Sequence, residues 1–211
     1  NNGGDGLVVA RQLHTRLRPG QLTVVLAASP QALEGDAAAN YRMLVGVGCP
    51  IRVAPTETAW EAAFPEIAGA TLLVDALLGT GLRGPVEGLY LRILRDLTAR
   101  FAPAQVVAVD IPSGLPSDTG EPAGESLRAG YTLTFTAPKV GQILPPNCER
   151  VGQLRVFSIG SDPGLYQDDP EIFLSTIDAA DIAKLLRPRA RDAHKGDFGH
   201  VLIVAGSTPK P

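Results

Sequence analysis

The chain has 211 residues, of which 45% are hydrophobic and 19% are charged, and its formal net charge is -3. This composition is typical of a globular protein and argues against a nucleic-acid-binding surface. No apolar run reaches the roughly 20 residues of a membrane-spanning helix, and two distant cysteines without a CxxC spacing fit a reducing, cytoplasmic setting.

The pattern of apolar residues predicts short, alternating strands and helices. A polar, glycine-rich loop at residues 1–6 leads into an amphipathic helix that closes at Pro19-Gly20. Beyond it, strands are predicted at 22–28, 51–53, 71–78, 106–110, 132–135 and 154–159, and helices at 30–46, 57–64 and 86–99. This alternation indicates a parallel sheet with helices on both faces.

Polar residues follow the ends of several predicted strands. Asp75, Asp110 and Lys139 each come after such an end. Because the carboxyl ends of parallel strands share one edge, where open α/β sheets bind ligands, we expect these side chains to line one rim. The loop at residues 1–6 would join them if a strand precedes it. Its backbone N–H groups suit an anion, but a simple turn in which Asp5 caps the helix fits equally well.

A second glycine-rich loop, residues 79–85, follows Asp75 and carries a single guanidinium, Arg83. Bare backbone N–H groups and an arginine predict a phosphate-binding loop, although a flexible surface loop with a solvated Arg83 is the alternative. The loop matches neither GxGxxG nor the Walker A pattern, so hydride transfer and ATP hydrolysis gain no support.

Two kinds of chemistry fit this rim. Asn2, Asp75 and Ser113 offer hard oxygen donors that suit an alkali or alkaline-earth ion, and the scattered histidines and cysteines do not suggest zinc. Asp110 and Lys139 are candidates for proton transfer, although a structural salt bridge between them is an equal alternative.

In their order along the chain, four motifs resemble those of the NAD(P)H-hydrate epimerase family, also called the YjeF N-terminal domain. The motifs are Asn1-Asn2-Gly3-Gly4-Asp5-Gly6, Val74-Asp75-Ala76-Leu77-Leu78-Gly79-Thr80-Gly81, Val109-Asp110-Ile111-Pro112-Ser113-Gly114 and Ala137-Pro138-Lys139. The resemblance covers residues 1–160. It implies a three-layer αβα, Rossmann-like fold and an isomerase that interconverts the R and S forms of NADHX and NADPHX, the hydrated nicotinamide dinucleotides, in metabolite repair.

The resemblance also implies roles for individual residues. Potassium would be bound by Asn2, Asp75 and Ser113. As a hypothesis, Asp110 and Lys139 would be catalytic and assist loss and re-addition of the substrate hydroxyl through an iminium-like intermediate. The implied substrate contacts are Asn1, Asn2, Gly3, Gly4, Asp5, Gly79, Thr80, Gly81, Leu82, Arg83, Gly84, Pro85, Tyr90 and Asp110.

The C-terminal part resembles a different family. Its motif, Lys195-Gly196-Asp197-Phe198-Gly199-His200 with the apolar strand expected at 201–207, is similar to the opening of a ribokinase-like, ADP- or ATP-dependent NAD(P)H-hydrate dehydratase. We therefore expect an epimerase domain at 1–160, a linker at 161–190 and an incomplete dehydratase domain at 191–211, all from a bifunctional parent.

Family members carry a helix and a central strand before the two asparagines, and we expect both to be missing here. The expected partner is a small-molecule substrate, not nucleic acid or membrane, and a homo-oligomer is left open. The alternative function is a catalytically inactive, Rossmann-like binding or scaffolding module.

Overall fold

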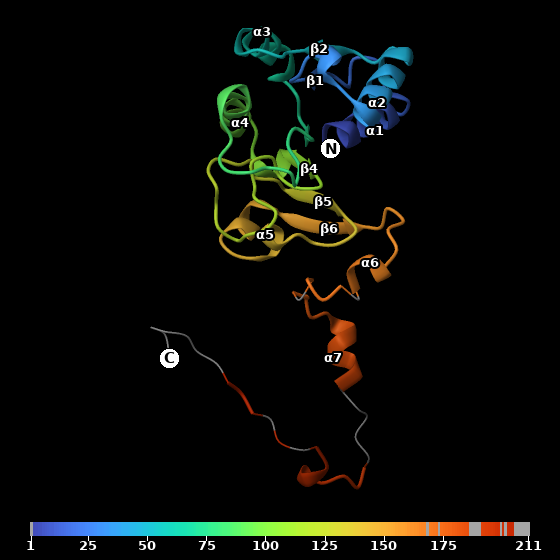
Figure 1. Cartoon of the computed structure of the whole chain (residues 1–211), viewed down its shortest axis with the longest axis vertical. Coiled ribbons are helices and arrows are strands. Elements are labelled where there is room, and N and C mark those ends of the chain that lie inside the picture. Colours follow the sequence, from blue (N-terminus) through green and yellow to red (C-terminus); the bar gives the residue numbers. More distant parts are fainter. Residues whose placement is uncertain are drawn as a thin grey trace. The chain divides into compact units, whose positions relative to one another are not determined.

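The computed structural model describes residues 2–167, 169–172, 174–185, 191–198, 200 and 202–204 (Figure 1). The chain divides into two compact units, Asn1–Ser161 and Asp162–Pro211. In the part of the chain that is described, no helix is long and apolar enough to cross a membrane.

The first unit is an α/β structure whose described strands are all parallel to their neighbours. Its helices are α1 (Asn2–His14), α2 (Gly35–Gly46), α3 (Glu57–Ile67), α4 (Gly88–Arg100) and α5 (Val140–Ile143). Its strands are β1 (Val24–Leu26), β2 (Ile51–Val53), β3 (Leu73–Asp75), β4 (Val106–Val109), β5 (Tyr131–Phe135) and β6 (Gln153–Phe157). The predicted α/β class with parallel pairing is therefore confirmed.

The described strands form two sheets. One contains β1 and β2, and the other has the order β3-β4-β5-β6. Within the larger sheet, Asp75 at the end of β3 pairs with Ala108 of β4, and Val109 pairs with Leu133 of β5. This register brings the carboxyl ends of β3, β4 and β5 to one edge, as the sequence predicts.

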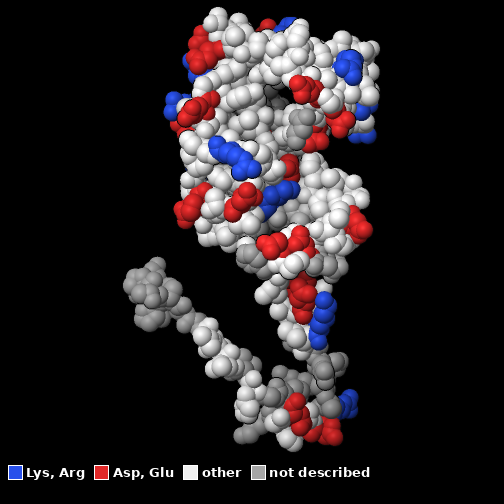
Figure 2. Space-filling view, in the orientation of Figure 1, with Lys and Arg blue, Asp and Glu red and all other residues white. Residues whose placement is uncertain are grey.

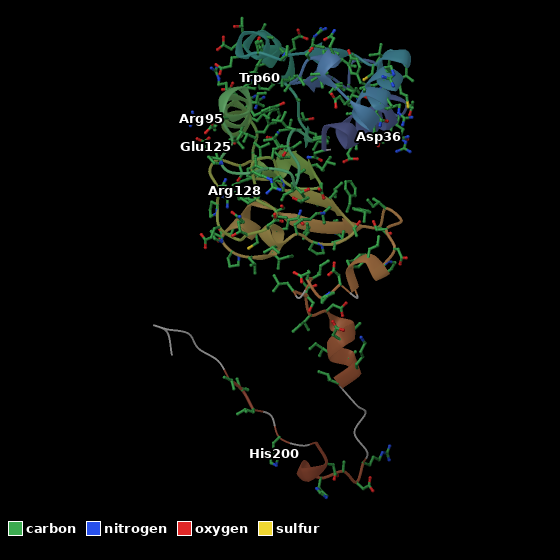
Figure 3. The ribbon with its side chains drawn as sticks, viewed as in Figure 1. Asp36, Trp60, Arg95, Glu125, Arg128 and His200 are labelled. Atoms are coloured by element: carbon green, nitrogen blue, oxygen red, sulfur yellow. The ribbon has the colours of Figure 1, made fainter. Side chains whose placement is uncertain are left out.

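The main apolar core joins α3, α4 and β4. Leu94 and Leu97 project from one stripe of α4, and Trp60 comes from α3. The Trp60 indole (Figure 3) is 2% exposed. Its Nε1 donates to Asp96 of α4 at 2.8 Å, so its polar edge is satisfied inside the contact. Thr56 caps α3 by accepting from Ala59 N at 3.2 Å.

The start of α1 corrects the predicted loop, because residues 2–6 are helical. The glycines there serve close packing. A Cβ on Gly6 would lie 2.5 Å from the Ala76 Cβ, and a Cβ on Gly4 would lie 3.6 Å from the Ala37 Cα of α2. Tertiary contact with α2 and with Ala76, the residue after β3, thus overrides the low helix propensity of glycine.

The second unit contains α6 (Gly164–Gln167), α7 (Ala179–Leu185) and a 3-10 turn, η4 (Lys195–Phe198). The strand expected at 201–207 is not confirmed. Residues 202–204 have no regular secondary structure, and the other residues of that range lie outside those described.

Candidate active site

The carboxylate of Asp75 lies at the end of β3 and is only 3% exposed. It accepts hydrogen bonds from Ser113 N at 2.7 Å, from Ser113 Oγ at 2.6 Å and from Leu77 N at 3.3 Å. Burial raises the pKa of the Asp75 carboxyl, and the hydrogen bonds from Ser113 and Leu77 oppose that rise. Asp75 is therefore a buried acid whose ionised form needs further compensation.

Asn2, the first residue of α1, reaches the same place. Its Nδ2 donates to Leu78 O at 2.9 Å, and Leu78 N donates to Ser113 Oγ at 2.8 Å. The loop passes so close that a Cβ on Gly79 would lie 3.0 Å from the Asn2 Cβ. Asn2, Asp75 and Ser113 thus meet around Leu78, although 76 residues separate Asn2 from Leu78 along the chain.

These oxygens fit an alkali cation. Asn2 is 6% exposed, and its Oδ1 is a buried acceptor with no hydrogen-bond partner among the described residues. A buried acceptor without a donor and a buried carboxylate that burial penalises are both stabilised by a hard cation. Across the described ranges, no group of three or more His, Cys, Asp or Glu residues gathers in the way that a transition-metal site requires.

Asp110 and Lys139 form an ion pair at the end of β4. Lys139 Nζ lies 2.7 Å from Asp110 Oδ1, and the two side chains are 22% and 17% exposed. Thr134 Oγ1 donates to the same carboxylate oxygen at 2.9 Å and accepts from Lys139 Nζ at 2.7 Å. Thr134 therefore orients the ion pair, and the pair remains partly accessible to solvent.

The backbone at Asp110 is unusual. Its φ is +63°, a left-handed conformation that glycine adopts most readily and that Asp and Asn adopt more often than other residues. The N–H of Asp110 donates to Leu133 O at 2.8 Å, and its carbonyl accepts from Gln142 Nε2 at 2.6 Å. Non-glycine residues held in this region are concentrated at functional sites.

A further carboxylate, that of Asp5 in α1, interacts with the charge of Asp110. Partial desolvation raises the pKa of the Asp5 carboxyl, and the negative charge of Asp110 acts in the same direction. Asp5 and Asp110 are therefore close enough to interact, and α1 contributes to the same rim as β4.

The loop at residues 79–85 lies beside the Asp75 cluster. Ser117 Oγ donates to Thr80 O at 3.2 Å, and Leu82 packs against the main core, whereas Arg83 is exposed. The segment that carries Ser117 is tied to α4 by a 2.8 Å ion pair between Arg95 and Glu125 (Figure 3). The loop is thus anchored by its neighbours while its guanidinium stays exposed.

The remaining described residues predicted to contact the substrate lie in α1, in the loop and in α4. Gly3 lies in α1, Gly81 and Gly84 lie in open parts of the loop, Pro85 packs near Gly124, and Tyr90 lies half-buried against the main core. Asn1 lies outside the described residues. On the face seen in Figure 2, Lys and Arg side chains are interspersed with Asp and Glu.

Three polar residues of this region were missed in the sequence: Ser117, Thr134 and Gln142. Thr134 is 0% exposed in β5, and Gln142 stands three residues after Lys139, the spacing of a helix cap. A polar residue within an apolar segment, a few positions from a candidate proton donor, is the sequence signal that could have found Thr134 and Gln142.

Comparison with known proteins agrees with these motifs. A family model described as YjeF-related protein N-terminus matches residues 1–141. The bifunctional NAD(P)H-hydrate repair enzyme Nnr of Thermofilum pendens is 40% identical over 207 residues, which are 98% of this chain and 38% of that protein. The Nnr enzyme of Escherichia coli is 36% identical, with 98% and 37% covered. The chain thus spans less than half the length of these relatives.

A crystal structure of the yeast protein ynu0 has the same fold. Its TM-score is 0.55 at 23% sequence identity, and the match covers 74% of this chain and 61% of the yeast chain.

Proposed function

The chain belongs to the YjeF-related protein N-terminus family, and from this premise we propose that it is an NAD(P)H-hydrate epimerase. It would interconvert the R and S forms of NADHX and NADPHX as an isomerase in metabolite repair. The observation that carries the proposal is the ion pair of Asp110 and Lys139, 2.7 Å apart at the carboxyl end of β4. The repair function named for the relatives supports the choice of substrate.

The pair suits the chemistry of an epimerase. Loss of the substrate hydroxyl needs a proton on the leaving oxygen, which the Lys139 ammonium can donate as water departs. The ring nitrogen then shares its lone pair with the hydroxyl-bearing carbon. When water returns to the other face, Asp110 accepts its proton, and the shared hydrogen bond restores Lys139.

The rest of the rim would hold the dinucleotide. Arg83 and the N–H groups of residues 79–85 would bind phosphate, because guanidinium and bare backbone donors suit that group. Residues Gly3, Gly4, Asp5 and Tyr90 would contact the remainder of the substrate. This arrangement fixes the ring near the proton-transferring pair.

We also propose that potassium is the resident ion. Asn2 Oδ1, the Asp75 carboxylate and Ser113 Oγ would hold it. The ion supplies positive charge, which would satisfy the buried acceptor of Asn2 and stabilise the ionised form of Asp75. The start of α1 would then be fixed to the end of β3, which keeps Asp5 at the rim.

The test is exchange between the two epimers in wild type, Asp110→Asn and Lys139→Met. We expect losses of about 10²-fold or more, the usual contribution of general acid–base catalysis. Asp181 and Lys184 form a matched acid–lysine pair at 3.1 Å on α7, so Asp181→Asn and Lys184→Met serve as controls. Wild-type rates in both rim variants would overturn the proposal.

A catalytically inactive binding or scaffolding module is the competing function. The buried Asp75 cluster and the Asp110–Lys139 pair favour the enzyme, because a scaffold needs neither. We propose further that the three-layer epimerase domain spans 1–160, that 161–190 is a linker and that 191–211 begins a ribokinase-like dehydratase domain of a bifunctional, cytoplasmic parent. The bifunctional names of the relatives support this organisation.

A further inference from the structure

Gln142 bridges the backbones of the two residues that form the ion pair. It belongs to α5 and is 3% exposed. Its Nε2 donates to Asp110 O at 2.6 Å, and its Oε1 accepts from Lys139 N at 2.8 Å. One amide therefore binds the backbone of both residues that would move protons, and it uses a donor for one and an acceptor for the other.

The bond to Asp110 acts on a conformation that needs support. A left-handed φ is less favourable for Asp than for glycine, so hydrogen bonds from the surroundings help to hold it. The N–H of Asp110 is held by Leu133, and its carbonyl is held by Gln142. Because the Asp110 side chain leaves the backbone between these two bonded groups, the direction of its carboxylate depends on both bonds.

The bond to Lys139 acts in the same way on the other half. Lys139 is the residue before α5, and its N–H is satisfied by the side chain three residues later. This cap fixes the point from which the lysine side chain extends to Asp110 and Thr134. Without this cap, the backbone of Lys139 is less restrained, and so is the origin of its side chain.

The helix that carries Gln142 is itself held tightly. Gly141 N donates to Ser117 O at 2.8 Å, and a Cβ on Gly141 would collide with the backbone carbonyl of Pro116. Gln142 thus follows a residue whose position is fixed by close packing, and its own buried amide is hydrogen-bonded at both ends.

We propose that Gln142 is a positioning residue of the epimerase, which sets the distance and direction between the Asp110 carboxylate and the Lys139 ammonium. This inference rests on the proposed function, since it concerns the geometry of the same proton transfer. Gln142 touches neither proton directly and acts through the two backbones that it joins.

The competing interpretation is a structural one, in which the amide only satisfies two buried backbone groups. Gln142→Glu separates the two. An ionised carboxylate keeps the acceptor for Lys139 N but has no donor for Asp110 O. The protonated carboxyl has both and is nearly the same shape as the amide. Burial raises the pKa of such a carboxyl, so the variant passes from the impaired to the competent form as the pH falls.

We expect kcat of Gln142→Glu at about pH 8 to fall roughly 10- to 100-fold while KM changes less than about threefold, because misplaced groups affect the reaction step and not ground-state binding. Relative to wild type at each pH, kcat should recover toward about pH 5.5. Gln142→Met, which lacks both bonds, should be impaired at every pH. The titratable groups in this network are Asp110 and Lys139, with Asp5 acting on Asp110 from α1.

The matched control is Gln105, another amide that joins two backbone groups. Its Oε1 accepts from Ala102 N at 3.0 Å, and its Nε2 donates to Thr71 O at 3.4 Å. It lies just before β4, at the opposite edge of the sheet from the rim. Gln105→Glu should change the melting temperature without changing the kcat ratio at any pH.

The outcomes separate the two proposals. Absence of exchange in the wild type overturns the proposed function and this inference together. Exchange in the wild type with an unchanged kcat for Gln142→Glu, or a loss that ignores pH, overturns the inference alone. Protonated Gln142→Glu is a neutral near-isostere, so its melting curve at low pH shows whether the variant folds.

Discussion

The buried carboxylate of Asp75 predicts a potassium-dependent stability that grows with pH. Burial raises the pKa of Asp75 in the folded state above its unfolded value, which is about 3.9. Without a cation, the folded state therefore holds the proton more tightly than the unfolded state. Stability is then greatest below the unfolded pKa and is lost as pH rises through the folded pKa. A cation beside the carboxylate favours its ionised form and offsets that loss.

The size of the effect follows from binding linkage. At a potassium concentration 100 times the Kd, an ion that binds only the folded state adds about 2.7 kcal/mol to the free energy of unfolding. For a chain of this length, each kcal/mol moves the melting temperature by about 2–4 °C, so the shift should be roughly 5–11 °C.

The assay compares melting temperatures in potassium chloride and choline chloride at equal ionic strength, from about pH 5 to about pH 8. The potassium effect should increase across this range and vanish in Asp75→Asn. Asp36→Asn, which changes an exposed acid on α2, should keep it (Figure 3). Equal melting in both salts at the upper pH, or a potassium effect that survives in Asp75→Asn, would refute the reasoning.

Two further predictions concern the loops. Arg83→Ala should raise KM roughly tenfold or more, because it loses a charged hydrogen bond to phosphate, whereas Arg83→Lys should keep part of that interaction. Steady-state kinetics with a wild-type KM for Arg83→Ala would contradict this prediction. Gly114 and Gly20 have φ of +91° and +84°, but only Gly114 is crowded, because a Cβ there would lie 2.9 Å from the Ser126 Cα. Gly20→Ala should cost about 1–2 kcal/mol in urea unfolding and Gly114→Ala about 4 kcal/mol or more; equal costs would refute the steric argument.

The edge of the sheet that carries the rim could be predicted, because apolar runs mark buried strands and an acid after each run marks its end. Asp75 and Asp110 lie where that rule puts them. The start of α1 could not be predicted in this way. Three glycines within its first turns read as a loop, and only their contacts with Ala76 and Ala37 make a helix there favourable.

The residues that support the ion pair, Thr134 and Gln142, could not be predicted from the hydrophobic periodicity either. Thr134 and Gln142 each bond to Lys139 and also to Asp110, which lies 24 and 32 positions away from them, respectively. Periodicity describes faces of helices and strands, whereas such bonds depend on the register of β4, β5 and α5 in three dimensions. A list of polar residues in apolar segments would have contained both without showing what they bind.

The hydrogen bond between Asn2 and Leu78 has a consequence for the order in which the chain assembles. It joins residues 76 positions apart, and Ser113 reaches Asp75 across 38. We expect contacts of such long sequence separation to form after more local ones, because a long loop has to close first. An interaction absent from the folding transition state leaves the rate of folding unchanged and slows unfolding. The hydrogen bonds that join Asn2, Asp75 and Ser113 to their distant partners would thus lengthen the lifetime of the native chain without increasing its folding rate.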